Sequence, residues 1–296
     1  MTPPDNQTDE FEAHRPRLVR LAYRMLGSML EAEDIVQDAW LRWRRADQGA
    51  VATPGAYLTR IVTRLCLDVL KSARVRRETY IGPWLPDPVV EPEDDVMRAD
   101  DLTLTLMLAL ERLSPLERAA FLLHDVFDVP LGEVAAALDR EPAAVRQLAA
   151  RARKHVRDGR PRYAVSREEG ERIAQAFFTA STKGDIDALR GLLAENVVIL
   201  SDGGGKVVAF RNPTIGLDRA LRLFAGLSRK FADKMPADIR PVWIDGLPGY
   251  ISQGRGDVLQ TTALEIEDGR ITAIYITRNP DKLGRIAGLL DGPLVS

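Results

Sequence analysis

The sequence predicts a multidomain protein in which two all-α domains, a helical bundle and a helix-turn-helix, precede an α+β domain. Three observations predict this arrangement. Apolar residues recur at helical spacing through the first half of the chain. Within that half, a short helical pattern, a tight turn and a basic helical pattern follow one another, as a helix-turn-helix requires. From about residue 166, two helical patterns give way to residues that alternate as strands do.

The helix-turn-helix pattern lies within residues 113–156. Ser114 can cap a helix, Pro115 needs no amide hydrogen bond at the first helical position, and Glu117 stands where a capping box requires it. We expect a helix up to about residue 124, a second over residues 131–138 and a third from residue 142. The outer side of the third helix carries polar and basic side chains: Arg146, Gln147, Arg151, Arg153 and Lys154.

Basic residues far outnumber acidic ones between residues 140 and 162, although the net charge of the whole chain is only −2. A helical hairpin with a solvated basic face is the bland interpretation. The position of the basic cluster at the end of a helix-turn-helix favours contact with a DNA phosphate backbone instead.

Composition limits the class of protein. The chain has 296 residues, of which 45% are hydrophobic and 28% charged, so we expect a soluble protein of two or three domains. Its first residues are polar and acidic, unlike a signal peptide, and no apolar run is long enough to span a bilayer. We therefore expect a cytoplasmic protein without membrane contact. The single cysteine, Cys66, excludes an internal disulfide and is expected to be buried.

Two further helices carry charges of opposite sign. In a helix expected over residues 31–45, one face carries Asp34, Gln37, Asp38 and Leu41. This face is either solvated or a docking surface for a basic partner helix. The next helix, expected from Pro54 to about Glu78 after a first helix over residues 11–26, is basic. Its candidate DNA-binding residues are Arg60, Arg64, Lys71 and Arg74.

A proline-rich, acidic segment follows over residues 79–101. Its prolines forbid a continuous helix at its start, and a solvated spacer is the bland interpretation. Because Trp84 and Leu85 are unsuited to a spacer, we expect part of the segment to pack on another part of the protein.

The C-terminal part predicts helices first and then a curved antiparallel sheet, an α+β cone. We expect helices up to about residue 183, over 186–193 and over 217–230, and strands over 197–200, 206–210, 239–244, 250–253, 259–266 and 270–277. Asp268-Gly269 between the last two strands is a strong hairpin signal.

The first half of the chain resembles a bacterial RNA polymerase sigma factor of the extracytoplasmic-function group. The resemblance is carried by FEAHRPRLVRLAYRMLGSMLEAEDIVQDAWLRW, by the helix that begins at Pro54, and by LSPLERAAFLLHDVFDVPLGEVAAALDREPAAVRQLAARARK, two independent motifs in the right order. It implies partners, core RNA polymerase and promoter DNA, and a role in promoter-specific transcription initiation. It also implies that polymerase contacts Asp34, Gln37, Asp38 and Trp40.

The same resemblance implies how promoter DNA is read. The basic third helix and the loop before it would read melted non-template strand, which needs a pocket and a stacking partner. Tyr57 is a candidate for that partner or a core residue. The helix-turn-helix would read duplex DNA, with Arg146 and Gln147 on bases and the other basic residues of that helix on phosphates. Glu141 departs from the family pattern, because relatives often have Ser or Thr there.

The last third of the chain resembles the SnoaL-like branch of the NTF2-like superfamily, which includes enzymes. We expect no catalytic residue, cofactor or metal site, because all three histidines lie outside this domain and its carboxylates are scattered. The carboxylates that could serve as catalytic bases in an enzyme are Asp202, Asp245, Asp257 and Glu265. A pocket for a small-molecule ligand stays open, with Trp243, Tyr250 and Tyr275 as candidate lining.

Three motifs resemble the signature of sigma factors with a fused SnoaL-like domain, in which that domain is implicated in regulation in cis. They are Trp84-Leu85-Pro86-Asp87-Pro88, Asp202-Gly203-Gly204-Gly205-Lys206 and Asn279-Pro280-Asp281-Lys282-Leu283. Asp87 departs mildly, since relatives often have Glu. The glycines suggest that another part of the chain approaches closely, and Lys206 is expected to pair with the acidic linker, for instance at Asp87.

We therefore predict a sigma factor, not an enzyme, with four segments: a region 2 helical domain (8–78), an acidic linker (79–101), a region 4 helix-turn-helix domain (102–160) and a SnoaL-like regulatory domain (166–296). Two other classes stay open. One is a one-component helix-turn-helix regulator with a ligand-sensing C-terminal domain, and the other is an enzyme with a DNA-targeting module.

Overall fold

The computed structural model describes residues 6–90, 104–157, 165–230, 239–254 and 258–289; within these ranges the side chains of residues 6, 48, 73–78, 157 and 254 are not described. The chain forms two compact units. The first contains Met1–Glu78 and Met107–Gly159, and the second contains Thr79–Leu106 and Arg160–Ser296. The described part of the linker thus belongs to the same unit as the C-terminal domain.

The first unit opens with three helices: α1 (Asn6–Leu26), α2 (Met29–Trp43) and, after the short η1 (Gln48–Ala50), α3 (Pro54–Glu78). Helix α1 starts five residues before the range expected from the apolar pattern and includes Pro16. Gly27 ends it with a φ of 73°, and Ser28 caps α2 by accepting a hydrogen bond from the Glu31 amide. Their apolar faces meet in a core that includes Trp43, Leu58 and Cys66.

The helix-turn-helix has the predicted elements. It consists of α5 (Pro115–Phe121), the π-helical turn η2 (Leu122–Val126), α6 (Leu131–Leu138) and α7 (Pro142–Arg157). The capping box between Ser114 and Glu117 is present, and Asp139 ends α6 in the left-handed conformation. A helix that the sequence analysis missed, α4 (Leu104–Leu110), precedes them; it begins in the second unit and ends in the first.

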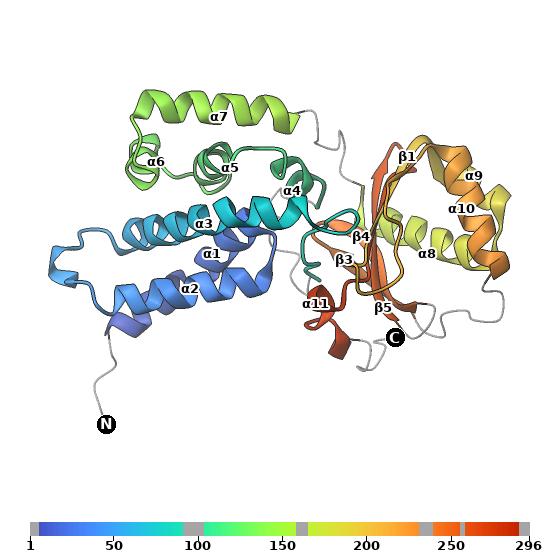
Figure 1. Ribbon diagram of the computed structural model, residues 1–296, viewed down its shortest axis with the longest axis horizontal. Coiled ribbons are helices and arrows are strands. Elements are labelled where there is room, and N and C mark those ends of the chain that lie inside the picture. The colour runs from blue at the N-terminus through green and yellow to red at the C-terminus, as the bar shows by residue number, and fades with distance from the viewer. Residues whose placement is uncertain (1–5, 91–103, 158–164, 231–238, 255–257, 290–296) are drawn as a thin grey trace. The chain divides into compact units, whose positions relative to one another are not determined.

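The second unit is α+β, as predicted. Its helices are α8 (Arg167–Lys183), α9 (Ile186–Leu192), α10 (Leu217–Lys230), α11 (Pro280–Leu283) and the short η3 (Ala287–Leu289). Its strands are β1 (Leu193–Asp202), β2 (Thr214–Ile215), β3 (Ile239–Ile244), β4 (Leu247–Gly254), β5 (Val258–Glu267) and β6 (Arg270–Thr277), in the spatial order β2-β1-β6-β5-β4-β3 (Figure 1).

Two predictions about this sheet are wrong. Residues 206–210 do not form a strand, because the glycines fold residues 203–207 into a compact turn in which the Lys206 amide donates to the Gly203 carbonyl. The sheet is also not fully antiparallel, since β1 pairs with β6 in parallel. A parallel pair cannot be joined by a tight turn, so its register depends on a long connection that local patterns do not encode.

The two faces of the sheet carry different layers. Tyr250 stands opposite Thr262 and, through β5, Ile276, on the face that α8, α9 and α10 cover. We call this the inner face. The opposite face, which includes Ile251, Thr261 and Tyr275, contacts the linker and the C-terminal helical turns (Figure 1). We call it the linker face.

Candidate nucleic-acid and linker-binding sites

The acidic face of α2 is open to solvent. Asp34, Gln37 and Asp38 are all exposed, as a docking surface requires. Two large apolar side chains flank them on the same helix, Leu30 at 68% exposure and Leu41 at 42%. The sequence analysis noted Leu41 on this face and missed Leu30. Exposed leucines beside carboxylates suit a partner helix that offers both apolar and basic side chains.

Trp40 is placed differently from the other predicted polymerase-binding residues. Its ring is half-buried and lies 4.9 Å from the Phe11 ring, while the Arg44 guanidinium stacks 5.8 Å from its centroid. The side chain therefore packs α1 against α2, and only one part of it faces solvent.

The basic side of α3 is exposed at Arg60, Arg64 and Lys71. Lys71 forms an i,i+3 ion pair with Asp68 at 2.9 Å. The side chain of Arg74 lies outside the described residues. Arg64 Nε donates to the Ala137 carbonyl at the end of α6, at 3.4 Å, so this cation contacts the helix-turn-helix within the first unit.

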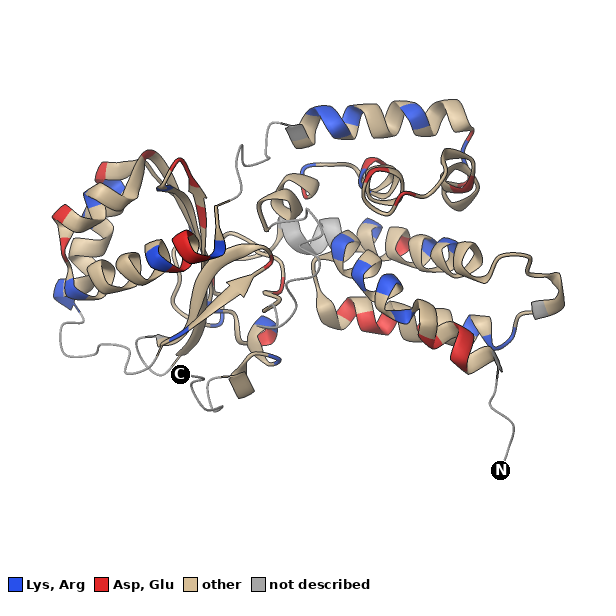
Figure 2. Ribbon diagram, turned by 180° about the vertical axis from the view of Figure 1, so that it is seen from behind, with Lys and Arg blue, Asp and Glu red and all other residues tan. Residues whose placement is uncertain are grey.

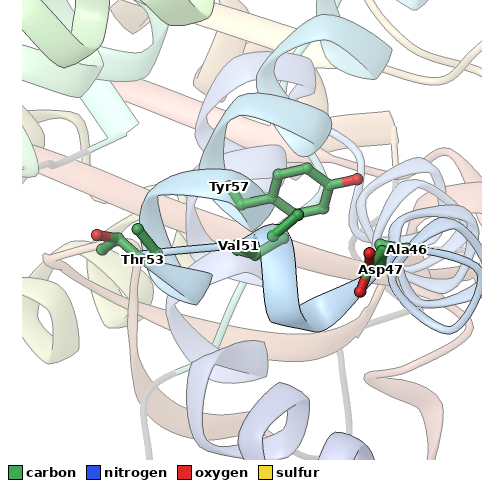
Figure 3. Close-up of a pocket in the computed structure, with 7 residues that line it drawn as sticks. Ala46, Asp47, Val51, Thr53 and Tyr57 are labelled. Carbon is green, nitrogen blue, oxygen red and sulfur yellow. The ribbon is translucent and has the colours of Figure 1, made fainter.

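A pocket of about 410 Å³ opens at the loop before α3. It is lined by Ala46, Asp47, Ala50, Val51, Ala52, Thr53 and Tyr57 (Figure 3). Tyr57 is half-buried, with its ring 5.9 Å from the ring of Trp43. The Tyr57 ring therefore packs on the core and also lines a pocket next to the basic helix.

The exposed face of α7 holds the predicted base-reading residues. Arg146 and Gln147 are exposed, as is Lys154 about two turns later. The basic residues lie at intervals along α7 (Figure 2). Two of the predicted phosphate contacts are already engaged: Arg151 pairs with Glu117 at 3.3 Å and Arg153 with Asp125 at 2.7 Å. These carboxylates fix the two guanidinium groups and offset part of their charge.

A buried arginine that the sequence analysis did not single out joins three elements of the first unit. Arg118 is 3% exposed and donates to the carbonyl oxygens of Met25 at 2.7 Å and Leu110 at 3.0 Å, and it pairs with Glu111 at 2.7 Å. Burial lowers the pKa of Arg118 to about 10, which still leaves it protonated at neutral pH. It ties the end of α1 to α4 and α5.

In the second unit, the Asp202 carboxylate binds the linker. Asp202 is 0% exposed and receives hydrogen bonds from the Tyr80 hydroxyl at 2.6 Å, the Leu85 amide at 2.9 Å and the Gly204 amide at 3.0 Å. Lys282 Nζ completes the set at 2.8 Å. We call Tyr80, Leu85, Asp202 and Lys282 the Asp202 clasp. Four donors thus satisfy the hydrogen-bonding capacity that this carboxylate loses to water on burial.

Lys282 contacts the linker through its ammonium group. Its ammonium group donates to the Leu85 carbonyl and stacks over the rings of Trp84 at 4.3 Å and Tyr80 at 5.2 Å. Leu85 is 0% exposed, so the expectation that the linker packs on another part of the protein is correct. Burial, followed by the hydrogen bond to Asp202, raises the pKa of Tyr80 and keeps its hydroxyl a donor.

The glycine motif and the Asn279–Leu283 motif interlock. A Cβ on Gly204 would overlap the Asn279 amide, and one on Gly205 would lie 2.9 Å from Ile81. Asn279 in turn donates to the Tyr80 hydroxyl at 2.9 Å. Lys206 pairs with Asp281 at 2.6 Å, within the C-terminal domain, so the pairing suggested for it with Asp87 is not the contact that the structure describes.

The remaining motif residues surround this site. Pro86, Pro88 and Leu283 are buried, Asp87 is half-buried, and Pro280 is exposed. Gly203 is packed against its own loop, because a Cβ there would lie 2.6 Å from the Val207 carbonyl oxygen. Most of the three motifs thus meet in one place on the linker face.

Trp243, Tyr250 and Tyr275 do not line one pocket. Tyr250 lies in the core of the inner face, where burial raises its pKa to about 12, and Tyr275 lies on the opposite face. The Tyr275 hydroxyl donates to Glu265 at 2.7 Å, and burial raises the pKa of that carboxyl. Trp243 packs near the start of α8, where its indole donates to Glu171. The proposed ligand lining is therefore wrong as a single cavity.

The described ranges hold neither a candidate metal-binding cluster nor a candidate membrane span. Among these residues, no group of three or more His, Cys, Asp or Glu side chains is placed to hold a metal ion. In the same part of the chain, no helix combines the length and apolarity needed to cross a membrane.

Comparison with known families identifies both halves of the first unit. Residues 11–76 match the model of Sigma-70 region 2, and residues 103–156 match the model of Sigma-70 region 4. The second match begins one residue before α4, so the helix that the periodicity missed is part of that domain.

Full-length relatives extend the match to the C-terminal domain. The chain is 39% identical over 295 residues to the ECF RNA polymerase sigma factor SigJ of Mycobacterium tuberculosis, covering 93% of each. It is 33% identical to the probable ECF RNA polymerase sigma factor SigI of the same species, covering 99% of this chain and 100% of the relative. The crystal structure of the M. tuberculosis SigJ superimposes with a TM-score of 0.75 at 35% identity, over 93% of this chain and 98% of that one.

Proposed function

The chain belongs to the extracytoplasmic-function group of RNA polymerase sigma factors, and from this premise we propose that its C-terminal domain regulates it in cis by holding the linker. A sigma factor binds core RNA polymerase and directs it to promoters. The observation that carries the regulatory proposal is the Asp202 clasp. In it, the buried pair of Asp202 and Lys282 binds Leu85, a residue of the linker that joins regions 2 and 4 in the sequence.

The clasp and the polymerase compete for one segment in this proposal. The family resemblance assigns the linker of a sigma factor to the active-site and RNA-exit path of the polymerase. Trp84 and Leu85 cannot lie there while Lys282 and Asp202 hold them. Because the domain is part of the same chain, its effective concentration is high and a modest interface suffices.

We propose that the exposed face of α2 docks on core polymerase. Asp34, Gln37 and Asp38 supply the polar contacts, and Leu30 and Leu41 supply apolar surface. Trp40 supports this face from beneath through its packing on Phe11. Since the polymerase of this proposal transcribes in the cytoplasm, the protein would act there.

We propose that the pocket beside Tyr57 receives an unstacked base of the melted promoter strand, with Arg60, Arg64 and Lys71 beside the backbone. The contact of Arg64 with Ala137 uses one of the five N–H donors of that guanidinium, the one on Nε. The duplex element would be read by Arg146 and Gln147, while Lys154 contacts phosphate.

In vitro transcription with core polymerase and the full chain tests the proposal. We expect a defined start site in the presence of the chain. A one-component regulator would instead bind its DNA tightly without polymerase and direct no start.

The clasp is tested in the same assay with Asp202→Asn, which keeps the shape of the side chain and removes the charge that pairs with Lys282. We expect more transcript than from the natural chain, because the linker is released. The matched control is Asp281→Asn, which removes the exposed partner of Lys206. Unchanged transcription with Asp202→Asn would refute regulation through the clasp.

Base reading is tested by binding to promoter variants. Arg146→Ala should reduce discrimination at one position of the duplex element by about 1–3 kcal/mol, whereas Lys154→Ala should weaken binding to all sequences alike. Equal, sequence-independent losses from both would place the reading face elsewhere.

We assign no reaction and no small-molecule site to the C-terminal domain. The three rings considered for a ligand are divided between both faces of the sheet and its edge, and Glu265 is engaged by Tyr275.

A further inference from the structure

Asp245 is a buried acid at the tip of a hairpin. It begins the turn between β3 and β4 with a φ of 47°, followed by Gly246 at 73°. Asp-Gly is a favoured pair for such a turn. The other Asp-Gly hairpin, Asp268-Gly269 between β5 and β6, has the same left-handed backbone, but Asp268 is exposed whereas Asp245 is 9% exposed. Turn chemistry alone therefore does not explain the burial of Asp245.

The entry of the acidic linker segment binds Asp245 twice. The Val89 amide donates to Asp245 Oδ2 at 3.1 Å, and the Asp245 amide donates to the Val89 carbonyl at 3.0 Å. The next residue, Val90, forms an antiparallel bridge with Ile244 and packs against Ile251. The linker thus adds to β3, the edge strand of the sheet.

The exit of the same segment binds Asp245 as well. The Leu104 amide donates to the Asp245 carbonyl at 2.9 Å. Leu104 is the first residue of α4, and the amides of a first helical turn have no partner within the helix. Asp245 supplies one, and Leu104 is buried there.

We infer that Asp245 is a positioning residue that holds both Val89 and Leu104 on the C-terminal domain and so ties the first residue of α4 to the sheet. This inference rests on the proposed regulation in cis and adds a second contact to it. The Asp202 clasp acts earlier in the linker, on Tyr80 and Leu85.

The contacts of Val89 and Leu104 meet at one turn. Val89 binds both the amide and the carboxylate of Asp245, and Leu104 binds the carbonyl of the same residue, so losing the carboxylate contact loosens the turn that presents this carbonyl. Loss of the Val89 contact should therefore also weaken the Leu104 contact, although Leu104 does not touch the Asp245 carboxylate in the described hydrogen bonds. A side chain that acted only on its immediate neighbour would not do this.

Hydrogen exchange of the full chain measures each contact at its own amide. Asp245→Gly removes the carboxylate and keeps the left-handed backbone. It should speed exchange of the Val89 amide by about ten- to a hundredfold, the loss expected for a hydrogen bond to a charged acceptor. Exchange at Leu104 should rise too, whereas Leu85 should stay protected.

Three further variants control the experiment. Asp245→Asn keeps an acceptor and should preserve most of the protection. Asp268→Gly makes the same change in the exposed hairpin and should leave Val89 and Leu104 unaffected. Val89→Pro deletes the same hydrogen bond from the linker side and should also speed exchange at Leu104, which keeps the test available if Asp245→Gly does not fold.

Two outcomes would overturn the inference: unchanged exchange at Val89 in Asp245→Gly, or unchanged exchange at Leu104 in both Asp245→Gly and Val89→Pro. Transcription by core polymerase with the same variants judges the proposed function separately. If both amides exchange faster while transcription stays unchanged, Asp245 holds the segment and regulation through the linker is refuted.

Discussion

Two ion pairs join the same two motifs of the C-terminal domain, and they differ mainly in their exposure to water. Asp202 and Lys282 lie 2.8 Å apart with side chains 0% and 9% exposed. Lys206 and Asp281 lie 2.6 Å apart with side chains 54% and 60% exposed. The exposed pair has the shorter distance, so distance alone does not tell which pair contributes more to stability.

The surroundings of the two pairs predict unequal roles. An exposed pair is screened by water and salt and contributes little, while removing one partner of a buried pair leaves a charge that nothing compensates. The buried pair also contacts the linker through Leu85 and Trp84, whereas the described contact of the Lys206 side chain stays within the C-terminal domain.

The largest effect should come from Lys282→Met, which keeps most of the length of the side chain and removes its charge. We expect it to destabilise the clasp by about 3–5 kcal/mol, because Asp202 stays buried without its cation. Hydrogen exchange of the Leu85 amide in the full chain measures this loss. A loss below about 1 kcal/mol would show that the three neutral donors suffice.

A double-mutant cycle sharpens the comparison. Trp84→Leu and Lys282→Met should couple by about 0.5–2 kcal/mol, the range of a cation–π contact, because the ammonium group lies 4.3 Å from the ring centroid. Trp84→Leu combined with Lys206→Ala should be additive in the same exchange assay. Coupling in the second cycle and none in the first would reverse the roles assigned to the two lysines.

A third carboxylate on the linker face tests burial without a cation. Glu265 is 8% exposed, and the neutral Tyr275 hydroxyl donates a hydrogen bond to it at 2.7 Å. Burial raises the pKa of Glu265, although that hydrogen bond opposes the change. The native state therefore favours the protonated form, and its contribution to stability is present below the ordinary glutamate pKa of about 4.3 and lost as pH rises through the raised pKa.

Glu265→Gln should remove this pH dependence and leave the domain more stable than the natural chain at neutral pH, by less than the loss from Lys282→Met. Exchange of β5 and β6 amides across a pH series, corrected for intrinsic rates, measures it. Asp268→Asn is the exposed control, and a lower stability of Glu265→Gln at neutral pH would show that the charged form is the one the fold favours.

The smallest effect should come from Lys206→Ala. We expect a change of about 0–1 kcal/mol in the stability of the clasp, decreasing as salt is added. Salt-independent destabilisation comparable to that of Lys282→Met would abolish the distinction between the two pairs.

Much of the fold could be predicted because its signals are local. The capping box at Ser114, the left-handed turn at Asp139 and the Asp268-Gly269 hairpin are encoded within a few residues, and the elements around them have the predicted bounds or lie close to them. The strand expected over residues 206–210 is wrong, because the three consecutive glycines fold residues 203–207 into a compact turn.

The candidate site was predictable in its parts but not in its contacts. Local patterns identify apolar stripes and unusual linker residues, and the resemblance to a family identifies the three motifs. Which lysine meets the linker depends on how β1 and β6 align, since this places Asp202 beside Thr277 and the start of α11. That alignment spans 75 positions or more of sequence, beyond the reach of helical or strand periodicity.

The sequence by itself determined most of the helices and strands of this protein, its charged helical faces and its membership of a family, because these follow from spacing, capping and motif composition. Only the tertiary structure decided that Asp202 pairs with Lys282, that Tyr250 and Tyr275 face opposite ways, and that Asp245 binds both ends of a linker segment. Burial and long-range contact set those outcomes, and both arise when distant segments pack together.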